Sequence, residues 1–151
     1  MKNLFDAAVA NQVKARLGQL EPKSERRWGK MTAAQMLAHC SVSMQWAVGE
    51  AVPDKLSLPA RWVGRLIKPI VFRNDDPMRK NSPTAKSLIV ADERDLGKER
   101  DRLLGLIDKF AAEGPAGCTR NPHSFFGRMT PEEWAILMYK HLDHHLRQFG
   151  V

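Results

Sequence analysis

The stretch TPEEWAILMYKHLDHHLRQF (residues 130–149) decides the fold class, because it contains the clearest helix start in the chain. Thr130 is expected to be the N-cap, and Pro131 then occupies the first helical position, where its missing N–H costs no hydrogen bond. Glu133 completes a capping box by bonding back to the N-cap N–H. Apolar side chains follow at three- and four-residue steps, so the sequence predicts a long amphipathic helix.

Three further stretches have the same apolar periodicity and predict long helices. Their expected spans are Phe5 to Leu20, Thr32 to Gly49, and Asp92 to about Glu113. The second begins with a capping box of its own, formed by Thr32 and Gln35. No stretch alternates convincingly with a two-residue period, so we predict an all-α fold, a bundle of four long helices.

The segment between residues 50 and 91 is expected to be a long crossover between the second and third long helices. It contains five of the nine prolines, which disrupt the helical pattern. A short helix is predicted within PARWVGRLIK (residues 59–68), with Trp62, Leu66 and Ile67 on one face. Arg61, Trp62 and Arg65 could line a pocket, or could belong to an ordinary amphipathic helix.

Composition limits the class of protein. A chain of 151 residues, 43% hydrophobic and 27% charged, is expected to form one domain over residues 1–151. No run approaches the roughly 20 apolar residues of a transmembrane helix, so no membrane partner is predicted. Two cysteines cannot build a disulfide scaffold, which favours a cytoplasmic location. The net charge of +7 forms no long basic run and no recognised motif, so no nucleic-acid partner is predicted.

The histidines of the last predicted helix are its most informative residues. With about 100° per residue, the apolar face centres roughly 40° from His141, and His145 lies near that centre. His144 lies at the edge of the face, and a modest rotation of the helix could exchange it for His141. Asp143 falls about 160° away and is expected to be solvated. Two imidazoles one turn apart are therefore expected to point into the bundle.

Burying two neighbouring imidazoles is costly unless a partner satisfies both. A metal ion can do this, because neutral imidazole is the commonest metal ligand. His39 is the only histidine on another predicted helix, and Ser43 shares its face. A shared ion bound by His39, His141 and His145 is one interpretation, and hydrogen-bonded core histidines without a metal are the other.

Three polar residues near the histidines are expected to support them, whereas the two cysteines are not. Gln35, Ser43 and Gln148 lie on the same faces as the histidines and could hold the rings by hydrogen bonds. Cys40 is expected to be a buried thiol and Cys118 a loop residue, so neither is predicted to be a ligand.

The histidine pattern excludes one familiar enzyme class and favours an open site. Leu142 follows the first histidine of the pair, where a zinc protease helix carries its catalytic Glu. Three neutral ligands would leave at least one coordination position open, which is typical of catalytic sites. Zinc, nickel, iron, manganese and cobalt all suit imidazole ligands.

Three segments together resemble the DinB-like superfamily of metal-binding four-helix bundles. They are WGKMTAAQMLAHC (28–40), NSPTAKSL (81–88) and FFGRMTPEEWAILMYKHLDHHLRQF (125–149). More narrowly, they resemble a branch catalogued as a domain of unknown function. The resemblance runs from Trp28 to the end of the chain, and it implies up-down-down-up topology with His39, His141 and His145 as the metal ligands.

The same resemblance suggests a reaction class. Relatives in the superfamily include bacillithiol and mycothiol transferases and a thiol-dependent maleylpyruvate isomerase. The expected function is therefore that of a divalent-metal-dependent enzyme whose three-histidine site activates a thiol or water, most closely a thiol S-transferase. It would act on a small-molecule substrate, with a low-molecular-weight thiol as a candidate cofactor, and a homodimer is one assembly that the resemblance leaves open.

Two alternatives stay open, and the sequence identifies no catalytic or thiol-binding residue. One is a metal-dependent hydrolase on the same site. The other is a non-enzymatic binding protein that the metal stabilises.

Overall fold

The computed structural model describes all 151 residues, and every regular element in it is helical. The elements are α1 (Ala7–Gly18), α2 (Ala33–Ala47), α3 (Leu58–Val71), the short 3-10 helix η1 (Lys86–Leu88), α4 (Leu96–Gly117) and α5 (Pro131–Gln148). The only β-type pairing is an isolated bridge between His123 and Gly127. The prediction of an all-α fold is therefore confirmed.

Side-chain caps determine where the two histidine-bearing helices begin. In α2, the Gln35 N–H donates to the Thr32 hydroxyl at 3.2 Å, and the Thr32 N–H donates to the Gln35 side chain at 3.0 Å. Thr130 and Glu133 form the same reciprocal pair at the start of α5, at 3.1 and 2.8 Å. Both predicted capping boxes are confirmed, so local chemistry sets the residue at which α2 and α5 each begin.

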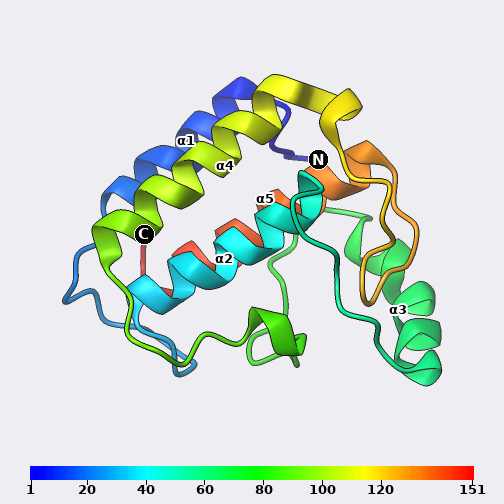
Figure 1. Ribbon diagram of the computed structural model, residues 1–151, viewed down its shortest axis with the longest axis horizontal. Coiled ribbons are helices and arrows are strands. Elements are labelled where there is room, and N and C mark those ends of the chain that lie inside the picture. The colour runs from blue at the N-terminus through cyan, green and yellow to red at the C-terminus, as the bar shows by residue number, and fades with distance from the viewer.

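Four helices pack around a common hydrophobic core. Helices α1 and α4 lie side by side, and α2 lies in front of α5 in the view of Figure 1. The largest fully buried side chains include Trp46 of α2, Phe110 of α4 and Trp134 of α5. Phe5 stacks on Phe110 with ring centroids 5.0 Å apart. Burying side chains of this size contributes roughly 1.5–3 kcal/mol each, which holds α2 and α5 against each other.

Helix α4 is broken at Gly114, directly after Glu113, near which its end was predicted. Gly114 has φ 58° and ψ −152°, outside the helical region, and Pro115 follows it. A side chain would be strained at this positive φ, so glycine allows the chain to leave the regular helix here.

Helix α3 lies apart from the four packed helices (Figure 1). Of its residues only Gly64 is buried, and an added Cβ there would collide with the carbonyl oxygen of Phe125. Trp62 and Leu66, which were predicted to share an apolar face with Ile67, are 63% and 72% exposed, whereas Ile67 is half-buried. The helix is therefore placed by a close backbone approach, and much of its apolar surface faces outward.

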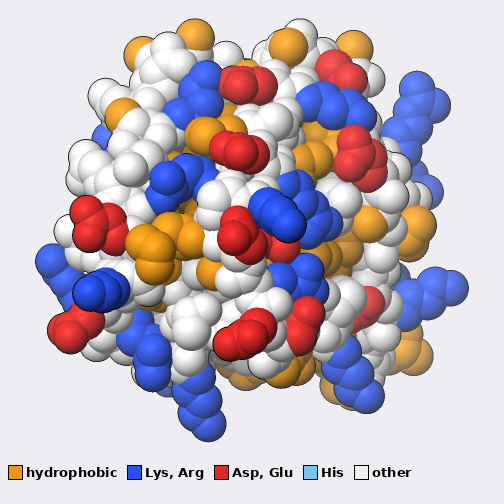
Figure 2. Space-filling view, turned by 60° about the vertical axis from the view of Figure 1, so that its left-hand side comes forward, with side chains coloured by type: hydrophobic (Ala, Val, Ile, Leu, Met, Phe, Trp, Pro, Cys, Tyr) orange, Lys and Arg blue, Asp and Glu red, His pale blue; other side chains and the backbone are white.

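None of the helices combines the length and the apolar composition that crossing a bilayer requires. On the face shown in Figure 2, Lys and Arg side chains are interspersed with Asp and Glu. The basic surplus is therefore not concentrated into one uninterrupted patch on that face.

Candidate metal centre

The three histidines predicted to act together lie together between α2 and α5. One ring nitrogen from each of His39, His141 and His145 lies within 4.8 Å of the other two. The Nε2 atoms of His39 and His141 are 2.9 Å apart. His145 completes the group, with its ring centroid 4.7 Å from each of the other two. This buried group could bind a metal ion.

The hydrogen bond of His39 fixes its tautomer. Its Nδ1 lies 2.7 Å from the carbonyl oxygen of Leu88, in η1. A carbonyl oxygen only accepts, so Nδ1 must carry the proton. In the neutral ring, Nε2 then presents its lone pair.

His141 is fixed in the same way by a hydroxyl group of α2. The Ser43 hydroxyl donates to the carbonyl oxygen of Cys40 at 2.8 Å, and this uses its single proton. Toward His141 Nδ1, which is 2.9 Å away, the hydroxyl can therefore only accept. His141 consequently carries its proton on Nδ1 and a lone pair on Nε2.

His145 is held by an amide whose orientation is itself fixed. The Gln148 side-chain nitrogen donates to the carbonyl oxygen of Trp28 at 2.7 Å. The Gln148 oxygen is thereby turned to His145 Nδ1, which lies 2.8 Å from it and donates. The third free nitrogen is again Nε2.

The result is three imidazoles whose Nδ1–H groups are all engaged and whose Nε2 lone pairs are all free. The 2.9 Å separation between the Nε2 atoms of His39 and His141 brings two lone pairs together, which is repulsive without a cation between them. Placing a proton there would require either His39 to give up its bond to the Leu88 carbonyl, or His141 to change tautomer while the Ser43 hydroxyl turns away from the Cys40 carbonyl. A divalent ion satisfies all three nitrogens at once, so the donor set fits a metal with imidazole ligands.

Burial keeps these histidines neutral. Desolvation is the largest cause that lowers the pKa of each ring, and it lowers the pKa of His145 to about 3. Neighbouring imidazoles lower the pKa of His141 further. Since neutral imidazole is the form that binds metals, the group is ready to act as a ligand set at neutral pH.

The centre contains no carboxylate. Asp143 is only two residues from His141 and His145, but its side chain pairs with Arg16 at 2.7 Å and with Arg147 at 2.6 Å. The expectation that Asp143 is solvated is wrong, because Arg16 of α1 covers this side of α5 and leaves Asp143 only 7% exposed.

The remaining histidines lie outside the centre. His144 is half-buried and packs against the ring of Trp28, with centroids 5.6 Å apart, so it does not take the place of His141. His123 Nδ1 accepts the backbone N–H groups of Phe125 and Phe126, each at 3.2 Å. His123 therefore organises a turn.

Both cysteines are free thiols that burial makes harder to ionise. Cys40 is fully buried, and burial raises the pKa of its thiol. Burial also raises the pKa of the half-buried Cys118 thiol, to about 11. Neither belongs to the three-histidine group, in agreement with the prediction.

The polar residues predicted to hold the rings divide into two sets. Ser43 and Gln148 bond to the rings as expected. Gln35 instead caps α2 and donates to the carbonyl oxygen of Asp92 at 3.1 Å. The third ring is held by the Leu88 carbonyl, which sequence reasoning missed because a backbone oxygen has no sequence signature.

The pattern of the whole chain matches one family. The model of the family described as "Protein of unknown function (DUF1569)" matches residues 4–150. The chain belongs to the DUF1569 family. The match includes both histidine-bearing helices, so the three-histidine centre of this DUF1569 protein lies inside the family domain. A comparison with curated proteins found no match, and neither did a comparison with solved structures.

Proposed function

We propose that this DUF1569 protein is a divalent-metal-dependent enzyme of the DinB-like type, with His39, His141 and His145 as the metal ligands. The observation that carries the proposal is the set of three free Nε2 lone pairs, each enforced by an occupied Nδ1–H group. Such hydrogen bonds orient ligand rings and increase their basicity in metal sites.

The most closely supported reaction class is thiol S-transfer. A divalent ion bound here would supply the positive charge that lowers the pKa of a thiol or of water. Three neutral imidazoles and no nearby carboxylate leave that charge uncompensated by the protein, which favours an anionic partner such as a thiolate. His141 is half-buried whereas His39 and His145 are buried, so we expect a small molecule to reach the group from the His141 side.

The protein's own contribution is to hold the rings and to exclude competing charges. Leu88, Ser43 and Gln148 each fix one imidazole in the tautomer that a ligand requires. Asp143 is kept away from the centre by its two arginine partners. A hydrolase on the same site has less support, because no carboxylate is present there to act as a general base.

The proposed architecture is a single DinB-like domain with up-down-down-up topology. The helix directions in Figure 1 support it, since α1 and α5 run in one sense and α2 and α4 in the other. The long connection that contains α3 and η1 separates α2 from α4, as the predicted crossover requires. The small-molecule substrate and the homodimer stay predictions.

Metal content tests the ligand assignment. The protein purified without chelator, and variants His145→Ala and His144→Ala, are analysed for bound metal. The parent and the His144→Ala control are expected to hold about one ion per chain, and His145→Ala to lose it, because His145 belongs to the three-histidine group and His144 does not. A parent protein without stoichiometric metal would falsify the proposal.

The reaction class needs a second assay on the metal-loaded protein. Glutathione, cysteine and an activated aryl chloride serve as probes: the sulfur–carbon bond forms, chloride leaves with its electron pair, and the thiol proton passes to buffer. Transfer that is lost in His145→Ala supports the transferase. Metal-dependent ester hydrolysis without transfer would instead identify the hydrolase, and stoichiometric metal without either reaction would identify a metal-stabilised binding protein.

A further inference from the structure

A basic cavity of about 330 Å³ lies between α3 and the turn that precedes α5. Its lining consists of Arg61, Arg65, Lys68, Pro122, Phe126, Gly127 and Arg128. None of these residues belongs to the three-histidine group, so the cavity is a separate feature of the molecule.

The cavity carries uncompensated positive charge. Four of its seven lining residues are Lys or Arg, and none is acidic. Lys68 is neutralised, because its ammonium lies 2.7 Å from the carboxylate of Glu133 and donates to the carbonyl oxygen of Arg128 at 2.8 Å. The guanidinium groups of Arg61, Arg65 and Arg128 make no ion pair and no side-chain hydrogen bond.

Packing fixes the position of the helix that carries Arg61 and Arg65. The missing side chain of Gly64 brings α3 against the carbonyl oxygen of Phe125. The bonds of Lys68 to Glu133 and Arg128 hold the same helix further along. Like charges at i and i+4 on one helix repel each other by about 0.2–0.5 kcal/mol, so an anion bound between Arg61 and Arg65 would relieve a small unfavourable interaction.

We propose that this cavity binds a phosphate-bearing anion. Guanidinium groups pair with phosphate through two parallel hydrogen bonds, and three free cations match its charge of nearly −2 better than that of a single carboxylate. The volume is in the range of small-molecule sites, and Phe126 and Pro122 provide apolar contact for the organic part of a ligand. The inference does not depend on what the histidines bind.

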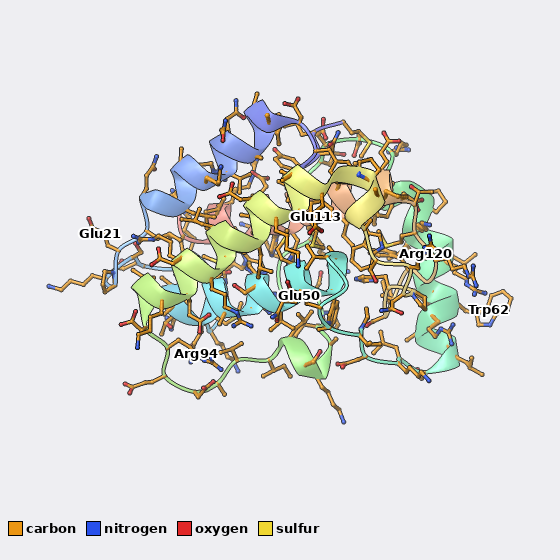
Figure 3. All side chains as sticks on the ribbon, turned by 45° about the horizontal axis from the view of Figure 1, so that its top comes forward. Glu21, Glu50, Trp62, Arg94, Glu113 and Arg120 are labelled. Carbon is orange, nitrogen blue, oxygen red and sulfur yellow. The ribbon has the colours of Figure 1, made fainter.

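The phosphate could belong to a free small molecule or to a lipid headgroup. Beside the cavity, the outer side of α3 exposes Leu58, Trp62, Leu66 and Ile70. Figure 3 shows Trp62 projecting from α3 away from the rest of the chain. An exposed apolar surface next to cations is also what an anionic membrane surface would contact, so the test must distinguish the two sources.

The test measures binding of inorganic pyrophosphate by calorimetry in phosphate-free buffer, and cosedimentation with phosphatidylcholine vesicles with and without phosphatidylglycerol. The variant with Arg61→Gln and Arg65→Gln removes two cavity cations. A variant with Arg79→Gln and Lys23→Gln removes two exposed cations outside the cavity and is the matched control. Thermal unfolding of both variants verifies that they are folded.

Saturable pyrophosphate binding that weakens about tenfold or more in the cavity variant, and less than about twofold in the control, would support the proposal. Binding to phosphatidylglycerol vesicles with the same dependence, and competition by pyrophosphate, would also support it and identify a lipid headgroup as the source. The proposal is overturned if neither probe binds, if the cavity variant binds pyrophosphate as tightly as the parent, if both variants weaken binding equally, or if vesicles alone bind and do so without loss in the cavity variant.

Discussion

Replacing Ser43 by alanine tests whether the hydrogen bonds around the histidines prepare them for a metal. The Ser43 hydroxyl accepts from His141 Nδ1 at 2.9 Å, and this bond holds the tautomer that leaves Nε2 free. Without it, His141 can place its proton on Nε2 and must lose that proton before it binds an ion. Loss of such a partner typically costs 10- to 100-fold in metal affinity, or about 1.4–2.7 kcal/mol.

Ser41 provides a matched control two residues earlier on α2. Its hydroxyl is also buried and also donates to a backbone carbonyl, that of Leu37 at 2.9 Å, but it makes no hydrogen bond to a histidine of the centre. Affinity for Zn²⁺ is measured by competition with a chromophoric chelator for the parent, Ser43→Ala and Ser41→Ala proteins. We expect Ser41→Ala to match the parent and Ser43→Ala to bind at least about tenfold more weakly. Equal affinities for the two variants would refute the reasoning.

Three further predictions concern stability. Because burial lowers the pKa of His123 to about 4, the unfolded chain binds the extra proton first as the pH falls below about 6.5. The free energy of unfolding of the parent should therefore fall by about 3 kcal/mol between pH 7 and pH 4 because of this residue. Chemical denaturation at the two pH values should show a fall for His123→Asn that is smaller by about the same amount. Asp143→Asn removes the charge of a buried carboxylate that pairs with two arginines, and it should lower the free energy of unfolding by about 2–3 kcal/mol in the same assay. This loss is smaller than that expected for breaking a fully buried ion pair, because both arginines keep contact with solvent. The metal content of the Asp143→Asn protein should be unchanged. Gly64→Ala should cost about 1–3 kcal/mol by forcing α3 away from Phe125, with faster proteolysis or amide exchange in α3.

Each of these stability predictions has a result that would contradict it. Parallel pH profiles for the parent and His123→Asn would show that His123 does not titrate in the expected way. A fully stable Asp143→Asn protein would show that the ion pairs contribute nothing net. Unchanged exchange in α3 of the Gly64→Ala protein would show that the contact with Phe125 does not position the helix.

Local chemistry made much of the fold predictable. The capping boxes at Thr32 and Thr130 were identified from residue types three positions apart, and the structure contains both. The helical period then placed His141 and His145 on the apolar face of one helix and His39 beside Ser43 on the face of another, because 3.6 residues per turn fixes which side chains of a helix share a face. These features depend on near neighbours in the chain, and a single sequence contains that information.

Features that depend on distant segments were not predictable in the same way. The helical period correctly placed Asp143 on the side of α5 away from the histidines, but it could not show that Arg16 of α1 covers that side. Likewise, the pattern of α3 indicated an apolar face and could not show that Gly64 would bring the opposite side of the helix to the protein. In both cases the environment comes from another element that packs there.

The hydrogen bond between His39 and the Leu88 carbonyl has a consequence for how the crossover can change. Because the acceptor is a main-chain atom, the hydrogen bond itself requires no particular side chain at residue 88. The Leu88 side chain has a different task, since it packs in the hydrophobic core and holds η1 in place. An insertion or deletion within residues 85–89 is therefore expected to move the acceptor even when it changes no side chain that touches the ring, whereas the exposed remainder of the crossover can vary in length more freely.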